Sequence, residues 1–294
     1  MADPSAGVRH HRLTRDAVVV EGPDAVGYLQ GQLSQDVAGL GVGESAWSWL
    51  LAPQGKVDAL VRVARADAER FVLDTDAGWG EALRDRLARF KLRTRAELRS
   101  TRISVLAVRG ADTGGSGGVP LATLWSGEPA VDLTDLGGRG PAVAGGPAPG
   151  REPTGLVGPA PGRELSAGEW EAARIAAGVP VMGAELTERT IPAETGLVPL
   201  TVSFTKGCYT GQELVARIDS RGSNVARHLR LLRSADPLVA GTELTRDGKV
   251  VGAVTSASSI GPVALGYVGR AVEPGATLDA GGVVAEVVAL PGLG

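Results

Sequence analysis

The pattern of apolar residues changes character beyond Arg221-Gly222, and this change limits the folds that the chain can adopt. Before that point, stretches of strand-like alternation flank stretches with helical spacing. After it, only strands separated by turn signals follow. Mixed elements in this order are typical of an α+β region of ferredoxin-like type, whereas strands alone are typical of a barrel. The sequence therefore predicts an α+β region and then an all-β barrel, with the boundary near Ser223 to Ala226.

The first part of the chain combines both kinds of periodicity. Gly22-Pro23-Asp24 predicts the start of a helix that ends near Leu33, since proline suits the first helical position and an acid suits the first turn. A second helix is predicted over Gly78 to Phe90, where apolar residues recur at helical spacing. Strands are predicted at Ala17 to Glu21, Ala46 to Ala52, Val57 to Ala64, Phe71 to Asp74, Ala96 to Arg99 and Ile103 to Val108.

Glycine and proline interrupt the pattern between Gly110 and Arg163. Short apolar pieces at Leu121 to Trp125 and Val131 to Leu133 are candidate strands, and the segment 137–163 is expected to be flexible. After it, Ser166 and Glu169 form a capping-box pattern that opens a helix over Trp170 to Ala177.

The last part of the chain carries the predicted barrel. Asp247-Gly248 is a two-residue hairpin signal between two of its strands. The predicted strands are Arg227 to Leu232, Glu243 to Arg246, Lys249 to Ser256, Ala264 to Val268 and Val283 to Val288.

Composition restricts the class of protein. With 43% hydrophobic and 21% charged residues and a net charge of −3, the chain is able to bury a substantial core. No run approaches the 18 to 20 apolar residues of a membrane helix, and the N-terminus lacks signal-peptide features, so we expect a cytoplasmic protein, monomeric and without a membrane partner. The basic run from Arg84 to Arg99 is interpreted as a solvated surface, and direct nucleic-acid binding is not expected.

Cysteine and histidine are too scarce for a metal centre within the chain. One cysteine excludes an internal disulfide and a self-sufficient iron–sulfur site, which ordinarily takes four cysteine ligands. Three histidines, two of them adjacent at His10 and His11, make a zinc or iron site improbable. No metal ligands are therefore assigned.

The single cysteine stands in an informative sequence context. Thr210 and Glu213 have capping-box spacing, which predicts a helix that begins just after Tyr209. Cys208 would then lie near the positive end of that helix and close to Lys206, and both would favour thiolate over thiol. The alternative is a buried structural cysteine in a glycine-rich turn. The motif is Lys206-Gly207-Cys208-Tyr209-Thr210-Gly211-Gln212-Glu213, and Glu213 is also spaced to pair with Arg217.

This octapeptide, with its trailing Arg217, resembles the signature of the YgfZ family, folate-binding proteins of iron–sulfur cluster assembly and repair that are related to the glycine-cleavage T-protein, GcvT. Other segments resemble the family in the same order along the chain: Gly22 to Ala25, Leu29 to Val37, Pro53 to Val57, Arg174 to Pro180 and Ile191 to Glu194. The resemblance implies a GcvT-like ring of two ferredoxin-like α+β subdomains within residues 8–222, followed by a β-barrel at 226–294.

The resemblance also implies a function. It suggests a tetrahydrofolate-binding accessory factor in the assembly or repair of iron–sulfur proteins, with folate and client or assembly proteins as partners. Cys208 would be the reactive centre, supported by Lys206 and Arg217. Gly55, Lys56, Asp74 and Arg174 are the candidate folate-binding residues.

Two departures from the T-protein pattern weigh against aminomethyl transfer. Ala59 stands where the T-protein has the second of two aspartates, and Ala176 stands where it has a pterin-binding glutamate. Alanine has no proton or lone pair to offer, so the acid–base role at position 59 is lost. We therefore expect no independent turnover. A folate-dependent aminomethyltransferase and a non-catalytic folate-binding regulator of tRNA modification remain the alternatives.

Overall fold

The computed structural model describes residues 7–110, 118–125, 128–136, 160–222 and 224–291. These residues form two compact units. The first comprises the described residues within 1–124, 128–164 and 200–212, and the second comprises those within 125–127, 165–199 and 213–294. Two short helices, α4 (Val198–Thr201) and α5 (Gln212–Ser220), cross from one unit to the other along the chain.

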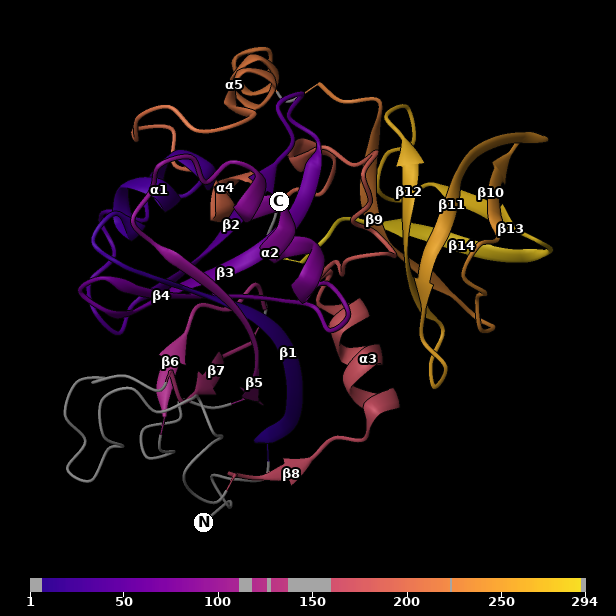
Figure 1. The fold of residues 1–294 in the computed structure, drawn as a ribbon. Helices are drawn as coiled ribbons and strands as arrows, with labels where there is room; N and C mark the ends of the chain where they lie inside the picture. The colour runs from indigo at the N-terminus through magenta and orange to yellow at the C-terminus, as the bar shows by residue number, and fades with distance from the viewer. Residues whose placement is uncertain (1–6, 111–117, 126–127, 137–159, 223, 292–294) are drawn as a thin grey trace. The chain divides into compact units, whose positions relative to one another are not determined.

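The first unit is built on one mostly antiparallel sheet around the long strand β1 (Arg9–Glu21) (Figure 1). Its hydrogen-bonded order is β2-β3-β4-β1-β5-β7-β6, and β8 pairs with β1 in parallel. The other strands are β2 (Ser45–Leu51), β3 (Val57–Asp67), β4 (Arg70–Thr75), β5 (Glu97–Arg109), β6 (Val119–Leu121), β7 (Ala130–Thr134) and β8 (Arg163–Glu164).

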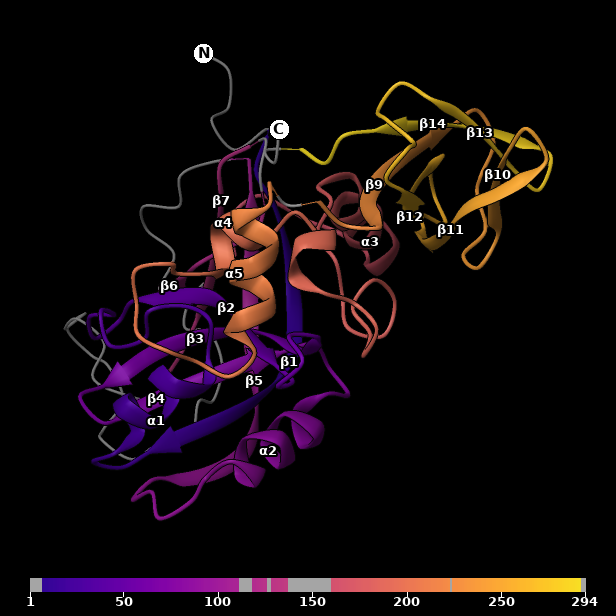
Figure 2. The same ribbon diagram turned by 90° about the horizontal axis from the view of Figure 1, so that it is seen from above.

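Two helices, α1 (Ala25–Gln32) and α2 (Gly80–Arg89), pack in this unit, and Figure 2 shows α2 lying along β1 and β5. The phenol of Tyr28 on α1 donates to the carbonyl of Leu87 on α2 at 2.6 Å, which joins the two helices. The carboxylate of Asp16 on β1 accepts from the backbone N–H groups of Gly78 at 2.8 Å and Gly80 at 3.1 Å. A strand residue thereby satisfies the free donors at the start of α2.

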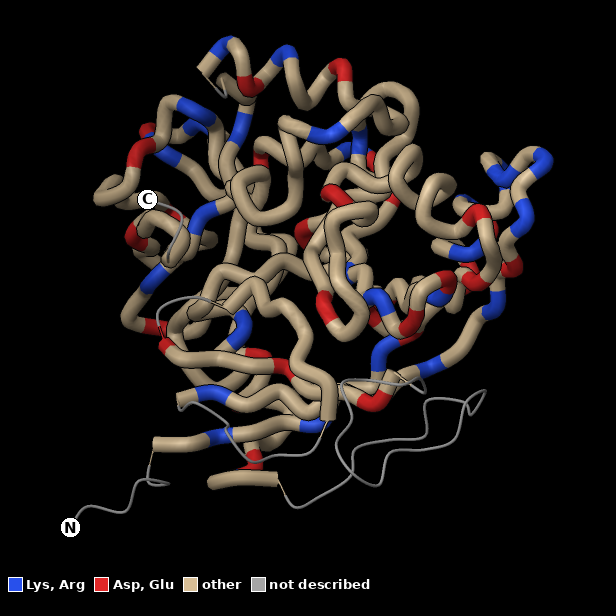
Figure 3. The backbone as a smooth tube through the Cα atoms, turned by 90° about the vertical axis from the view of Figure 1, so that its left-hand side faces the viewer, with Lys and Arg blue, Asp and Glu red and all other residues tan. Residues whose placement is uncertain are grey.

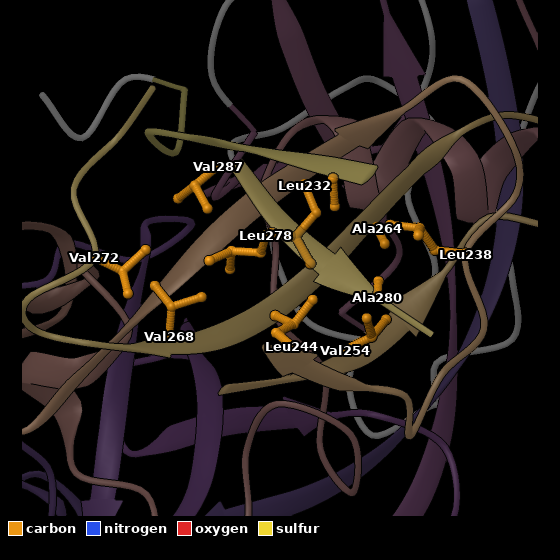
Figure 4. Packing of buried hydrophobic residues seen from close by; sticks show 11 residues of the cluster. Leu232, Leu238, Leu244, Val254, Ala264, Val268, Val272, Leu278, Ala280 and Val287 are labelled. Atoms are coloured by element: carbon orange, nitrogen blue, oxygen red, sulfur yellow. The ribbon is translucent and has the colours of Figure 1, made fainter. Parts of the chain in front are cut away.

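The second unit contains a closed barrel with the order β10-β11-β12-β9-β14-β13. Its strands are β9 (Arg227–Ser234), β10 (Glu243–Arg246), β11 (Lys249–Ala257), β12 (Val263–Gly269), β13 (Thr277–Ala280) and β14 (Val283–Val288). Leucine, valine and alanine side chains from these strands and their loops fill the barrel, as Figure 4 shows for the cluster around Leu232, Leu244 and Leu278.

A small layer packs against the outside of this barrel. Ile175 on helix α3 (Ala167–Ala176) is fully buried against Leu229, Leu231 and Leu265 of the barrel wall. The turn η1 (Pro192–Glu194) follows in the same unit. The buried carboxylate of Glu185 accepts from the hydroxyls of Thr255 at 2.7 Å and Ser256 at 2.6 Å, so the layer is also tied to β11 by hydrogen bonds.

The structure confirms the predicted fold class, an α+β region with a C-terminal barrel. It also confirms the capping box of Ser166 and Glu169 and the hairpin at Asp247-Gly248, where both residues have positive φ. The strands predicted at Ala96 to Arg99 and Ile103 to Val108 are in fact one strand, β5, and β13 was not predicted. Most of the segment expected to be flexible, 137–159, lies outside the described residues.

The division into an α+β region at 8–222 and a barrel at 226–294 stays a prediction. The barrel does begin at Arg227, close to the predicted boundary. The compact units, however, group residues 165–199 and α5 beyond Gln212 with the barrel.

Candidate functional site

Cys208 is exposed on the segment that runs from Thr201 to Gly211, which we call the cysteine segment. The segment passes beside α1, as the orange trace before α5 in Figures 1 and 2 shows. Exposure of the thiol contradicts the alternative of a buried structural cysteine. The geometry instead presents the thiol to solvent on a segment whose flanking residues are fastened to the first unit.

Lys206 is the first of these fastenings. Its ammonium donates to the backbone carbonyls of Gln30 at 2.7 Å, Leu33 at 2.7 Å and Gln35 at 2.9 Å, at the end of α1 and just beyond it. Burial lowers the pKa of Lys206 to about 8, and the nearby Asp36 carboxylate acts in the opposite direction. An ammonium has three donors. All three are used here, so Lys206 holds the segment in place. Its support of the Cys208 thiolate stays a prediction.

Ser34 is the second fastening, and it is fully buried. Its hydroxyl donates to the carbonyl of Thr201 at 2.7 Å and accepts from the backbone N–H of Trp49 at 2.8 Å. Its own carbonyl accepts from the N–H of Ser203 at 3.0 Å. One serine thus connects the start of the cysteine segment to the edge strand β2.

The residues after Cys208 dock on the same surface. The N–H of Thr210 donates to the carbonyl of Gly31 at 3.1 Å, and Gly211 has a φ of +82°. A Cβ at Gly211 would lie 2.6 Å from the carbonyl oxygen of Ala52 and 2.8 Å from the Cβ of Leu51. Only glycine fits so close an approach to β2 in this backbone conformation. Tyr209 is buried, and its ring lies 5.3 Å from the ammonium of Lys206.

The helix after the motif begins later than predicted. α5 starts at Gln212, and the side-chain oxygen of Gln212 accepts from the N–H of Tyr209 at 3.1 Å. The hydroxyl of Thr210 instead donates to the carbonyl of Gly31 at 3.5 Å. The predicted capping box of Thr210 and Glu213 is therefore replaced by Gln212. The helix therefore begins four residues after Cys208 along the chain.

Glu213 and Arg217 are both exposed on α5. Neither forms an ion pair with another residue in the described part of the chain, so the predicted pairing along the helix is not present. The role of Arg217 in the site stays a prediction.

The candidate folate-binding residues of the first unit lie in different environments. Gly55 is buried in the turn between β2 and β3 with a φ of +78°, and a Cβ added at Gly211 would lie 3.3 Å from its Cα. Lys56, the next residue, is exposed. Asp74 is fully enclosed, and its carboxylate accepts from the guanidinium of Arg15 and from Arg62 Nε at 2.9 Å. Burial alone would raise the pKa of Asp74, but the two arginines hold it below its usual range.

The network around Asp74 continues through Arg62, which donates to Asp132 at 2.8 Å and lies 5.2 Å over the ring of Trp47. Asp74 is thus part of a buried ionic layer on the sheet. Its oxygens are engaged by protein donors, and its contribution to folate binding stays a prediction.

Arg174 belongs to the second unit and is also buried. It donates to Glu171 at 2.5 Å and to the carbonyl of Val179, and its guanidinium lies 3.6 Å from the Glu185 carboxylate. These contacts give Arg174 a structural role at the end of α3. Its contribution to folate binding stays a prediction.

Trp49 is a residue that the sequence did not single out. It is completely buried, yet its indole Nε1–H has no hydrogen-bond acceptor among the described residues. By contrast, Trp47, two residues earlier on β2, donates its indole N–H to the carbonyl of Ala122 at 3.0 Å. A buried donor without an acceptor costs about 1 to 3 kcal/mol.

The distribution of charged side chains and of possible metal ligands does not define a specific binding site among the described residues. Lys, Arg, Asp and Glu are interspersed along most of the chain (Figure 3), and several arginines of the basic run are paired, for example Arg86 with Asp58 and Arg95 with Asp24. Within the described ranges, no group of three or more His, Cys, Asp or Glu side chains is placed to hold a metal ion. The helices described here include none that is long and apolar enough to cross a membrane.

The fold has a clear counterpart. The crystal structure of glycine cleavage system aminomethyltransferase T from Bartonella henselae matches with a TM-score of 0.74 and 21% sequence identity, covering 98% of this chain and 87% of that one. The chain therefore has a GcvT-like fold.

Sequence comparison adds relatives of a second kind. The chain is 49% identical over 57 residues to the tRNA-modifying protein YgfZ of Yersinia pestis, which is 19% of this chain and 17% of the relative. The same figures apply to YgfZ of Yersinia pseudotuberculosis. The matched stretch thus spans less than a fifth of the YgfZ relatives. An uncharacterized protein of Haemophilus influenzae is 28% identical over 211 residues, 70% of this chain and 67% of the relative.

No protein-family model matches the chain. The structural and sequence comparisons together nevertheless confirm the resemblance that the motifs indicated: the chain is similar to YgfZ and has the fold of the related GcvT proteins.

Proposed function

We propose that the chain is a tetrahydrofolate-binding accessory factor of YgfZ type that acts in the assembly or repair of iron–sulfur proteins, in the cytoplasm and as a monomer. The observation that carries this proposal is the exposed thiol of Cys208, held on a segment that Lys206 and Ser34 fasten to α1 and β2. The YgfZ relatives and the GcvT-like fold support it.

A fixed, exposed thiol suits contact with a client rather than storage of a cluster. Iron–sulfur clusters are ordinarily held by four cysteine thiolates, and this chain has one cysteine. The cluster is therefore the client's, and Cys208 meets either the cluster or the cysteines that hold it. No membrane or direct nucleic-acid contact is part of the proposal.

Folate binding is supported by the YgfZ relatives and by the GcvT-like fold. Asp74 and Arg174 already have protein partners, so they are not the groups on which this proposal rests.

Aminomethyl transfer is the weaker alternative. Ala59 is buried on β3 and has no titratable group, and the adjacent Asp58 is paired with Arg86. The position that needs an acid or base therefore has none. A non-catalytic regulator of tRNA modification is the other alternative, because the YgfZ relatives are named as tRNA-modifying proteins.

Two measurements test the proposal. Tetrahydrofolate should bind the purified protein in a titration, and the gene should restore iron–sulfur enzyme activity in cells that lack their own factor. Cys208→Ser should still bind folate but should not restore iron–sulfur enzyme activity, because the substitution removes the thiol without changing the fold. Full restoration by Cys208→Ser would favour the non-catalytic regulator, and formation of methylenetetrahydrofolate from an aminomethylated carrier would favour the transferase.

A further inference from the structure

Phe204 on the cysteine segment is the one aromatic residue that the fold leaves exposed. The chain has three Phe, three Tyr and five Trp residues, and all of them lie in the described ranges. The others are buried or half-buried, whereas 51% of Phe204 is accessible to solvent. Aromatic side chains are enriched at protein–protein interfaces and at their energetic centres, and this makes Phe204 a candidate anchor for a partner.

Leu200, just before the cysteine segment, adds to the exposed apolar surface, with 47% of it accessible to solvent. The large hydrophobic residues that are exposed in the first unit are Val42, Leu92, Leu200 and Phe204. Two of these four stand within eight residues of the exposed Cys208 along the chain. Exposed apolar side chains of this unit are thus concentrated around the thiol in sequence.

The exposed side of residues 200–211 carries no charged side chain apart from the thiol when it ionises. Besides Leu200 and Phe204, the exposed residues of this stretch are Thr205, Gly207 and Cys208. Lys206 is half-buried, and its ammonium already donates to three backbone carbonyls. Charged residues are depleted at the centre of protein interfaces. This surface therefore suits an apolar, uncharged protein surface rather than a nucleic acid, which binds mainly through basic side chains.

The backbone that carries Phe204 is held on both sides. The N–H of Ser203 donates to the carbonyl of Ser34 at 3.0 Å, and the ammonium of Lys206 donates to the carbonyl of Gln35 at 2.9 Å. An exposed side chain on a fixed backbone loses less conformational entropy when it binds a partner.

Phe204 and Cys208 are also close enough to meet one partner. Four residues of chain span at most about 14 Å. An interface of standard size covers about 800 Å² on each partner, which is a patch with a radius of roughly 16 Å. A protein that docks with its contact centred on Cys208 therefore covers Phe204 as well.

We propose that Phe204 and Leu200 form the docking surface for the iron–sulfur client protein, and that Phe204 packs against apolar residues that flank the client's cysteines. This inference rests on the proposed function and names the part of the client that Cys208 meets. Phe204 touches the client beside the reacting atoms, so it determines which cysteines are presented to the thiol.

The first test uses the full chain and two short peptides, each with one cysteine activated as a mixed disulfide with thionitrobenzoate. The thiolate of Cys208 attacks the peptide sulfur, a new disulfide forms, and thionitrobenzoate leaves and is measured by its absorbance. Leucines flank the cysteine in one peptide and serines in the other, and each rate is divided by that of the same peptide with glutathione. Wild type should react about three- to tenfold faster with the leucine peptide, the range expected for partial burial of one aromatic side chain.

Variants assign this preference to the docking surface. Phe204→Ser should lose the preference and keep its rate with the serine peptide. Leu92→Ser is the matched control and should behave as wild type, because Leu92 is 81% exposed in the same unit but lies far from Cys208 in the sequence. In cells that lack their own factor, Phe204→Ser should fail to restore iron–sulfur enzyme activity, with its melting temperature and tetrahydrofolate affinity unchanged. Phe204→Leu, which keeps an apolar side chain, should restore activity in part.

Each outcome decides the assignment. If Cys208→Ser loses the restoration while Phe204→Ser keeps it, or if wild type reacts equally with both peptides, the inference is overturned and the proposed function stands. Equal loss in Leu92→Ser also overturns it. Full restoration by Cys208→Ser would make the proposed function fail, and this inference would fail with it. The peptide preference of wild type decides the question even where a variant does not fold.

Other occupants of the surface give different results with Phe204→Ser. Weaker binding of tetrahydrofolate would make Phe204 a folate contact. Dissociation of a wild-type dimer would make it a contact between copies of this chain, and weaker binding to phosphatidylglycerol vesicles would make it a membrane contact. Each of these results overturns the inference.

Discussion

The ammonium of Lys206 donates a 2.7 Å hydrogen bond to the backbone carbonyl of Leu33, a residue 173 positions earlier in the sequence. Leu33 is the C-terminal cap of α1, where carbonyls are left without helical partners and the helix dipole favours a positive charge. Lys206 thus acts as a helix cap supplied from a distant part of the chain. The lysine of the cysteine motif is tied to the N-terminal motif that contains α1.

The first prediction concerns the stability of this contact. Lys206→Met keeps the length of the side chain but leaves three carbonyls without their donor, so it should lower the free energy of unfolding by about 1 to 3 kcal/mol. Chemical denaturation measures the change. Lys56→Met is the control, because Lys56 is exposed, and it should change stability by less than about 0.5 kcal/mol. Equal effects of the two substitutions would contradict the capping role.

The second prediction is the pH dependence of the same lysine. The pKa of Lys206 is about 8 in the folded protein and has its ordinary value of 10.5 in the unfolded chain. Between these values the unfolded chain binds more protons, so stability contributed through this group rises as the pH rises from about 8 to 10.5. Wild type should therefore gain stability relative to Lys206→Met across that window. A difference between the two proteins that stays constant over the window would show that Lys206 does not titrate there.

The contacts of Lys206 also mark the limit of what the sequence predicted. The helices and most strands followed from apolar periodicity and capping residues, as Ser166 and Glu169 illustrate. The acceptors of Lys206 are backbone carbonyls more than 170 positions away, and carbonyls have no sequence signature. The sequence therefore predicted the motif as a site, but it did not predict the contacts that Lys206 makes with α1.

The ionic contacts of Asp74 were not predicted from the sequence for a related reason. Its environment depends on the register that places Arg62 opposite it on β3, and on Arg15 of the neighbouring strand. A sequence predicts that these strands exist, but it does not fix their register. The sequence analysis did not single out Trp49, because a tryptophan in an apolar strand is typical of the hydrophobic core. Only the structure shows that its indole N–H lacks an acceptor among the described residues.

The third prediction compares two glycines of the cysteine motif. Gly211→Ala should lower the free energy of unfolding by roughly 1 to 3 kcal/mol, because φ is +82° and the added Cβ would meet the carbonyl of Ala52 at 2.6 Å. Gly207→Ala should be tolerated, since a Cβ added there would meet no described atom within 4 Å. Thermal unfolding of the two variants makes the comparison, and similar melting temperatures would refute the close docking of Gly211 on β2.

The fourth prediction tests the connection through Ser34. Ser34→Ala removes the hydroxyl that donates to the carbonyl of Thr201 and accepts from the N–H of Trp49, so it should destabilise the protein by about 1 to 3 kcal/mol. Ser203→Ala is the control, because that half-buried hydroxyl lies 3.3 Å from the exposed hydroxyl of Thr205, and a change below about 0.5 kcal/mol is expected. Protection of the amide of Trp49 from hydrogen exchange should fall in Ser34→Ala alone. Unchanged protection would mean that the serine does not hold the segment.

The last prediction separates folding from function at Arg217. This arginine is exposed on α5 and forms no ion pair with a described residue, so Arg217→Ala should change the free energy of unfolding by less than about 0.5 kcal/mol. If the motif acts as a unit, the same variant should fail to restore iron–sulfur enzyme activity in cells that lack their own factor. Arg217→Lys should restore it only in part, because lysine keeps the charge but not the planar, bidentate donor. Arg221→Ala, an exposed arginine just beyond the same helix, should restore activity fully. Full restoration by Arg217→Ala would remove this arginine from the site and confine the functional surface to the cysteine segment and β2.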